Sequence, residues 1–209
     1  LLENKKIVSA IKGIVQGPDI LLNEYLKQEY NFPLTNYFAL LGPCHAEEVA
    51  AEKLSYLTFS GVDLETTSEI SSYFKTPYIN TITNHDILGV QFAAVLKNIY
   101  ALGAGIAHGL EYGDNFLSVY IANSADEMAG FLKTVGIQHI VVGEHITDPI
   151  THKRDTNYAA SVYLGDLLVT CYSLYSRNRT FGNMIGKGYT VQSAQLELIM
   201  VAEGYYASR

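Results

Sequence analysis

The sequence has 209 residues, with 14 Lys and Arg against 21 Asp and Glu, so its net charge is −7 when His is neutral. Hydrophobic residues make up 48% and charged residues 17%, below the charged share of about 25% in globular chains. This composition predicts an extensive core and excludes a mainly disordered chain. The acidic balance argues against nucleic-acid binding, which needs a basic surface. Two cysteines, Cys44 and Cys171, are too few for a disulfide framework and fit a reducing compartment.

Neither a signal peptide nor a clear membrane span is apparent. The longest apolar run, Phe92–Ile106, contains Lys97 and Asn98, which argues against a bilayer span. We therefore expect a cytoplasmic protein without membrane insertion. The chain starts without Met and ends inside a helix-like pattern, so we expect a fragment of a longer protein. Tag removal together with a naturally short C-terminus is the alternative.

The first 85 residues alternate between strand-like and helix-like segments. Strands are predicted at Lys6–Ile14, Tyr37–Leu41, Tyr56–Ser60 and Tyr78–Thr83, and helices at Ile20–Tyr30, Ala46–Leu54 and Leu64–Phe74. Such alternation predicts βαβ units and a largely parallel sheet.

After residue 85 the pattern becomes helical. Helices are predicted at Leu88–Ile106, Asn115–Val135, Tyr158–Leu168 and Val191–Ala202. The polar stretch 143–157 is expected to be an exposed loop, and Ile140–Val142 could form a short strand. The predicted fold is thus α/β in residues 1–85, followed by an all-α domain in residues 86–209.

Lys97 is the most informative residue, because it interrupts an otherwise apolar helical pattern. It shares a helix face with the small residues Ala93, Ala94, Ala101, Ala104 and Gly105. Dehydration there lowers the pKa of a lysine unless an anion pairs with it, which suits a proton donor and acceptor near neutral pH. The alternative is a lysine that extends to solvent from the edge of a packed helix.

Asp166 has the same character, since it is a carboxylate inside the apolar run Tyr163–Cys171. Buried charges are paired or neutralised, so Lys97 and Asp166 are each a candidate partner for the other. Asp166 could instead, or in addition, cap a helix over Leu167–Cys171.

Two further sites carry basic residues. Ser176-Arg177-Asn178-Arg179 presents forked donors that suit a phosphate or carboxylate, although such a run is more often a solvated turn. Lys12 is expected at the carboxyl end of a parallel strand, where open α/β sheets bind ligands; a lysine that reaches solvent is the alternative.

Other motifs are excluded. Gly103-Ala104-Gly105 lies inside a helical pattern, and no G-x-G-x-x-G sequence follows a strand. The six His show no metal-ligand spacing, so no metal site is expected, and His45 is interpreted as a helix-start residue. The absence of a G-x-S-x-G motif excludes an α/β-hydrolase.

Several segments, in order and spacing, resemble the NAD(P)-dependent glycerol-3-phosphate dehydrogenases near their bacterial branch. They are Lys12-Gly13, the run from Gly42 to Ala50 (GPCHAEEVA), Leu96-Lys97-Asn98, Gly103-Ala104-Gly105, the run from Gly109 to Asn115, Gly165-Asp166-Leu167, Ser176-Arg177-Asn178-Arg179 and Glu203-Gly204. The resemblance implies a Rossmann-type domain followed by a helical domain. It also implies interconversion of dihydroxyacetone phosphate and sn-glycerol 3-phosphate with NAD or NADP.

The resemblance also implies roles for individual residues. Lys97 would transfer the proton, and Asp166 would orient it and contact the substrate. The implied substrate-binding residues are Lys12, Gly42, Cys44, Asn98, Thr170, Ser176, Arg177 and Asn178; those for the cofactor are Lys12, Ala46, Arg177, Val201 and Glu203. Cys44 departs from the Ser or Thr of many relatives, and the family's glycine-rich cofactor loop has no counterpart in residues 1–209.

Two other functions stay open. One is another two-domain hydroxy-acid dehydrogenase of the 6-phosphogluconate or ketopantoate type. The other is a non-catalytic helical assembly module. The partner expected from the resemblance is a small phosphorylated triose or polyol, with a homodimer possible; the sequence leaves the choice between NAD and NADP open.

Overall fold

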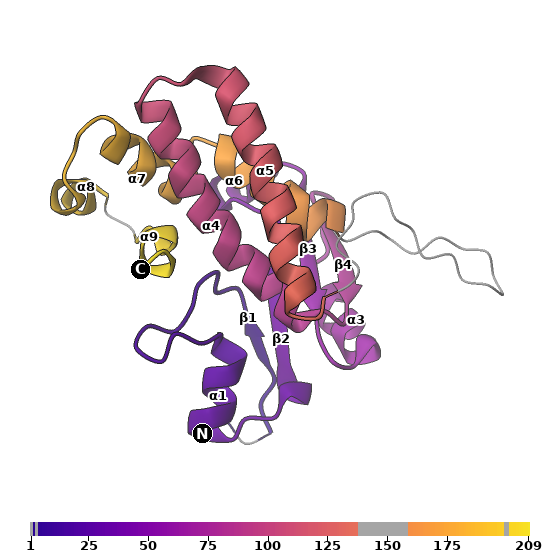
Figure 1. The fold of residues 1–209 in the computed structure, drawn as a ribbon. Coiled ribbons are helices and arrows are strands. Elements are labelled where there is room, and N and C mark those ends of the chain that lie inside the picture. The colour runs from indigo at the N-terminus through magenta and orange to yellow at the C-terminus, as the bar shows by residue number, and fades with distance from the viewer. Residues whose placement is uncertain (1, 3, 138–158, 199–200) are drawn as a thin grey trace.

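A computed structural model describes residue 2 and residues 4–137, 159–198 and 201–209. Its four-stranded sheet has the order β1 (Ile7–Ser9), β2 (Tyr37–Leu41), β3 (Ser55–Ser60) and β4 (Ile79–Asn84). Strands β1 and β2 are parallel, as are β3 and β4, whereas β2 and β3 are antiparallel. The predicted mostly parallel α/β half, followed by a helical half, is confirmed (Figure 1).

The antiparallel pair β2–β3 departs from a uniformly parallel sheet. Between these strands lies only the five-residue helix α2 (Ala46–Ala50), not the predicted Ala46–Leu54. At about 1.5 Å per residue such a helix is too short to carry the chain back along the sheet. Glu52 adopts a left-handed conformation (φ 54°) just after it, which ends the helix and directs the chain into β3.

The first strand is shorter than predicted, because it ends at Ser9 rather than continuing to Ile14. The residues after it leave the sheet toward the helical half, where Asn98 Nδ2 donates a hydrogen bond to the Lys12 carbonyl at 2.8 Å. Lys12 therefore sits in a loop three residues beyond a strand end.

The remaining elements of this half flank the sheet. Helix α1 spans Leu22–Tyr30, a 3₁₀ turn spans Leu34–Asn36, and α3 spans Leu64–Ser72. The Asp63 side chain caps α3 by accepting a hydrogen bond from the Thr66 N–H at 2.8 Å. Such caps satisfy amide groups that a helix start leaves free.

The two long helices predicted after residue 85 are present. They are α4 (Ile87–Gly109) and α5 (Gly113–Thr134), and Figure 1 shows α4 in the middle of the molecule with α5 alongside. Over its full length α4 is long and apolar enough to cross a membrane, which the shorter window Phe92–Ile106 did not indicate. Most of its apolar window is buried inside the protein, and residues such as Val90, Ala94 and Ala101 belong to the main core.

Small residues bring α4 against α7 (Arg177–Gly186). A Cβ atom on Gly105 would collide with the Arg179 carbonyl, and one on Gly182 would collide with the Leu102 carbonyl. The small-residue face that contains Gly105 therefore lets another helix approach closely.

The last third of the chain folds differently from the prediction. Instead of one helix over Tyr158–Leu168, a π-helix (Ala159–Gly165) runs into α6 (Asp166–Tyr172). Residues 176–179, the possible turn, are the cap and first turn of α7. In place of a helix over Val191–Ala202 there are α8 (Val191–Glu197) and α9 (Glu203–Ala207). The expectations for Ile140–Val142 and 143–157 lie outside the described residues.

Candidate active site

Lys97 and Asp166 form a buried ion pair between α4 and α6. The Lys97 Nζ atom lies 2.5 Å from Asp166 Oδ1, and the two residues are 3% and 1% exposed. The alternative of a solvent-reaching Lys97 is therefore wrong. Asp166 is also not a helix cap, because Gly165 before it is already helical (φ −62°, ψ −44°) and no side-chain cap is present.

Burial sets the acid–base behaviour of this pair. It lowers the pKa of Lys97 to about 7; the Asp166 carboxylate opposes this effect, and the Lys12 ammonium adds to it. Burial alone would raise the pKa of Asp166, but the charges of Lys97 and Lys12 outweigh it and hold that pKa below its ordinary value. A lysine with a pKa near 7 is present in both forms at neutral pH, so its ammonium can give a proton and its amine can take one.

Lys12 reaches the same carboxylate from the α/β half. Its Nζ atom lies 3.8 Å from Asp166 Oδ2, and its side chain is 29% exposed. Lys12 Nζ also donates a hydrogen bond to the Gly42 carbonyl at 3.2 Å. Among the described residues, the buried Asp166 Oδ2 makes this ion pair with Lys12 but no hydrogen bond.

The loop after β2 borders this group. Gly42 has φ 129°, and a Cβ atom there would lie 2.8 Å from the Tyr56 carbonyl. Burial raises the pKa of the half-buried Cys44, while Lys12 opposes this effect. His45, the predicted helix-start residue, lies at the N-cap of α2. Sequence reasoning did not place His45 near the site. Burial lowers the pKa of His45, and the charges of Lys97 and Lys12 lower it further. Ala46 follows as the first residue of α2.

Three residues predicted to touch substrate also make hydrogen bonds within the protein, and their substrate contacts stay predictions. Asn98 Nδ2 holds the Lys12 carbonyl, and Thr170 Oγ1 donates to the Asp166 carbonyl at 2.5 Å. Asn178 Oδ1 accepts from the Gly204 N–H at 2.8 Å. The first contact ties the Lys12 loop to α4, the second lies within α6, and the third ties α9 to α7.

The basic cluster opens α7. The Ser176 hydroxyl accepts from the Arg179 N–H at 3.3 Å and so caps the helix. Arg177 is exposed, whereas Arg179 is 8% exposed and its Nε makes no hydrogen bond to the residues that the structure describes. Within the described part of the chain, no hydrogen bond or ion pair joins Ser176 or Arg177 to the Lys97–Asp166 pair.

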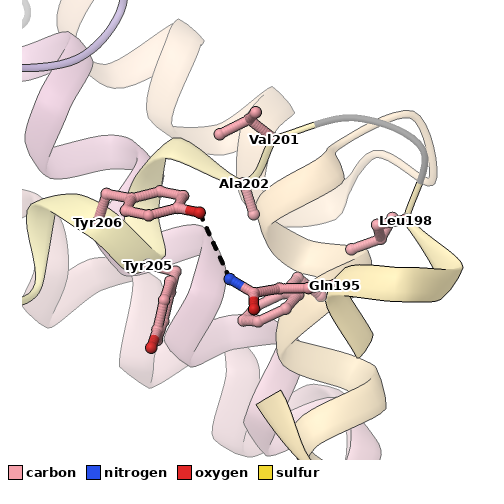
Figure 2. A pocket seen from close by; sticks show the side chains of 7 residues that line it. Gln195, Leu198, Val201, Ala202, Tyr205 and Tyr206 are labelled. Carbon is pink, nitrogen blue, oxygen red and sulfur yellow. Dashed lines mark hydrogen bonds between the residues drawn. The ribbon is translucent and has the colours of Figure 1, made fainter. Parts of the chain in front are cut away.

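Helix α9 brings Glu203 to the loop of Lys12. A Cβ atom on Gly13 would lie 2.8 Å from Glu203 Oε2, so the missing side chain makes room for this carboxylate. Val201 instead lines a cavity of about 340 Å³ together with Phe181, Gln195, Leu198, Ala202, Tyr205 and Tyr206. Figure 2 shows Gln195 and Tyr206 across this cavity, joined by a 3.4 Å hydrogen bond. Neither Lys97 nor Asp166 lines it.

An α/β half and a helical half that meet at a buried Lys–Asp pair define a two-part protein with an acid–base centre at the junction. The family described as NAD-dependent glycerol-3-phosphate dehydrogenase matches in two parts, its C-terminus over residues 86–209 and its N-terminus over residues 1–67. The chain belongs to this family.

Individual proteins similar to this chain carry the name of the same family. The chain is 35% identical over 203 residues to the glycerol-3-phosphate dehydrogenase [NAD(P)+] of Clostridium botulinum, covering 97% of this chain and 56% of the relative. It is 35% identical to that of Clostridium tetani, covering 100% and 55%. The crystal structure of glycerol-3-phosphate dehydrogenase from Coxiella burnetii superposes with a TM-score of 0.82 at 26% identity, covering 97% and 57%. The chain thus spans about half the length of the relatives it matches.

Proposed function

We propose that the protein catalyses the NAD(P)-dependent interconversion of dihydroxyacetone phosphate and sn-glycerol 3-phosphate. The observation that carries this proposal is the buried Lys97–Asp166 pair, whose lysine has a pKa of about 7. The names of the Clostridium relatives give the same reaction for those proteins. In this proposal residues 1–85 are the second half of a Rossmann-type domain, and residues 86–209 are the substrate domain.

Lys97 is the proposed proton donor during ketone reduction. Negative charge develops on the carbonyl oxygen, and an ammonium at that oxygen stabilises the charge and then transfers its proton. In the reverse direction the neutral amine accepts the proton of the hydroxyl group. A pKa of about 7 for Lys97 keeps both forms populated at neutral pH.

Asp166 is proposed to serve two partners with its two oxygens. Oδ1 holds Lys97 at 2.5 Å, while the buried Oδ2, which makes no hydrogen bond within the described residues, accepts one from a substrate hydroxyl. Lys12, 3.8 Å from Oδ2, contacts the substrate from the opposite half, next to Gly42 and Cys44.

The residues present fit the reacting end of a nicotinamide dinucleotide. The backbone at Gly13 leaves room where Glu203 approaches, and the exposed Arg177 offers a forked cation. Lys12, Ala46, Arg177, Val201 and Glu203 are the proposed cofactor-binding residues. When bound, the cofactor supplies the hydride. The sequence holds no glycine-rich loop after a strand, so we expect the 209-residue chain alone to show neither turnover nor tight NADH binding.

The substrate phosphate is proposed to bind at the start of α7. This ten-residue helix carries the exposed Arg177, the Ser176 hydroxyl and the Asn178 side-chain amide at its N-terminus. Helix N-termini and arginine forks both favour phosphate. Binding there would orient the carbonyl toward Lys97. A homodimer and a cytoplasmic location stay predictions.

The test is an activity assay of the full-length protein with NADH and NADPH. Dihydroxyacetone phosphate, 6-phosphogluconate and ketopantoate serve as rival substrates, and we expect turnover with the first only. Arg177→Lys should lower kcat/KM strongly for dihydroxyacetone phosphate and much less for unphosphorylated dihydroxyacetone. Arg209→Lys, at an exposed arginine, is the control. Turnover with a rival substrate, or equal Arg177→Lys losses for both dihydroxyacetone forms, would contradict this assignment.

A further inference from the structure

A second contact joins the two helical segments that carry the Lys97–Asp166 pair. The Tyr163 hydroxyl donates a hydrogen bond to the Asp86 Oδ2 atom. Tyr163 is buried in the π-helix, three residues before Asp166, and Asp86 is the N-cap of α4, the helix of Lys97. The two helical segments are therefore tied at two points, once by the ion pair and once by this hydrogen bond.

The Asp86 carboxylate is itself fixed. Its Oδ1 atom accepts the Gly89 N–H at 2.8 Å, and the Asp86 N–H donates to Asn84 Oδ1 at 2.9 Å. Asn84 is the last residue of β4. The hydroxyl of Tyr163 thus binds an anchor that is held by both the sheet and the first turn of α4.

Gly89 makes this contact possible. A Cβ atom at position 89 would lie 2.5 Å from the Tyr163 hydroxyl oxygen and would also collide with the Asp86 carboxylate. The missing side chain leaves the space in which the two groups meet. Any larger residue at this position pushes them apart without removing a polar group.

The position of Tyr163 matters because the helical run continues unbroken through Gly165 into α6. Successive residues of a helix are about 100° apart around its axis, so a slip by one residue would turn Asp166 away from Lys97. π-Helical turns are rare and are frequent at functional sites. An anchor inside that turn fixes the rotation of everything that follows.

We propose that the Tyr163–Asp86 hydrogen bond is a positioning device that holds Asp166 in register against Lys97. Tyr163, Asp86 and Gly89 touch neither the ion pair nor a ligand; they act through the placement of α6 on α4. The contact geometry does not depend on the proposed function, whereas its effect on turnover rests on it.

Loosening this anchor has a defined electrostatic consequence. Among the described residues, the charged and titratable groups that interact with Lys97 include Asp166 and Cys171 of α6, Lys12 of the loop after β1 and His45 before α2. Of these, Asp166 raises the pKa of Lys97, and Lys12 lowers it. An Asp166 that leaves Lys97 therefore lowers the pKa of Lys97 further.

The experiment measures the pKa of Lys97 by competitive amine labelling across pH in the full-length protein, which requires no turnover. Tyr163→Phe removes the hydroxyl, and Gly89→Ala wedges the pair apart while providing a better helix former. Asp86→Asn keeps the cap and offers an amide N–H to the Tyr163 oxygen. Tyr73→Phe is the matched control, because the Tyr73 hydroxyl also donates to a carboxylate, that of Glu69 on the exposed face of α3.

We expect Tyr163→Phe and Gly89→Ala both to lower the pKa of Lys97 and to reduce kcat by roughly tenfold, with KM for the phosphorylated substrate nearly unchanged. Asp86→Asn should recover most of the loss seen in Asp86→Ala, and Tyr73→Phe should match the wild type. An unchanged Lys97 pKa in both Tyr163→Phe and Gly89→Ala would overturn the proposal even if the wild type is active. If the wild type is inactive but both variants lower the pKa of Lys97, the positioning role is supported and the proposed function is refuted.

Discussion

The two halves of the molecule contribute to the site in different ways. The helical half supplies Lys97 and Asp166 from the interior of packed helices, where both are almost fully buried. The α/β half supplies Lys12 and the segment from Gly42 to Ala46 from loops beyond strand ends, and the Lys12 side chain is 29% exposed. Burial lowers the pKa of Lys97 to about 7, so the helical half sets the acid–base behaviour of this lysine, whereas the loops of the α/β half supply the proposed ligand contacts.

This difference predicts that changes in the helical half abolish chemistry and that changes in the α/β half alter it. The physical reason is solvent. Water screens charges that it reaches and leaves buried pairs strongly coupled. In the full-length protein we therefore expect substitutions of the buried pair to have the largest effects on activity and substitutions in the body of the α/β half to have the smallest.

The largest effect is expected from Lys97→Met, which keeps an apolar chain of similar length but removes the transferable proton. We expect kcat for dihydroxyacetone phosphate reduction to fall by roughly 10²–10⁴-fold, with the fold retained in circular dichroism. Lys187→Met, on the exposed residue just after α7, is the control. A near-normal kcat for Lys97→Met would remove Lys97 from the reaction.

Asp166→Asn should affect both activity and stability. It leaves a buried amine without its anion, so the pKa of Lys97 falls further and the protonated form disappears at neutral pH. Removing one partner of a buried pair costs about 3–5 kcal/mol of unfolding free energy. This loss should be larger near pH 6 than near pH 9, because only at the lower pH is the wild-type lysine charged and paired. Urea unfolding at both pH values measures it, and equal losses would contradict the pairing.

Lys12→Met should act in the opposite direction on the same lysine. The Lys12 ammonium lowers the pKa of Lys97, so its removal raises that pKa, and the pH above which ketone reduction slows should move upward. We expect a higher KM from the lost ligand contact and only a small change in the maximal rate. A pH profile that moves downward would show that Lys12 does not act on Lys97 through its charge.

The smallest effect on activity is expected from Asp63→Ala in the α/β half. This change removes the side-chain cap of α3 and should cost about 1 kcal/mol of stability. Because α3 carries none of the site residues, kcat and KM should stay at wild-type values. A clear change in kcat would mean that the body of the α/β half, and not only its loops, tunes the reaction.

The continuous apolar run Tyr37–Leu41 predicted β2, the strand predicted at Tyr78–Thr83 lies one residue before β4, and helical patterns predicted the long helices α4 and α5. The prediction overextended the first strand, because Ala10 and Ile11 after Ser9 are exposed and Asn98 of α4 holds the Lys12 carbonyl. The reversal between β2 and β3 depends on the left-handed Glu52, a conformation that the sequence does not mark with a glycine.

The site was predictable where a charge interrupts an apolar run. Lys97 and Asp166 were paired on that ground, and their atoms are 2.5 Å apart. The internal bonds of Asn98 and Asn178 were not predictable, because each depends on a backbone group that is distant in sequence and that only the fold brings close. The burial of Arg179, rather than of Arg177, likewise depends on how α7 docks against α4. The Tyr163 anchor lies in a π-turn, which no apolar period indicates.

The most direct test of the central claim is the pH dependence of the hydride-transfer step, measured in single turnovers with saturating NADH and dihydroxyacetone phosphate. We expect the reduction rate to fall as pH rises through about 7, where Lys97 loses its proton, and we expect Lys97→Met to abolish this fall together with most of the rate. A rate that is constant up to about pH 9, or a fall that persists in Lys97→Met, would contradict this expectation.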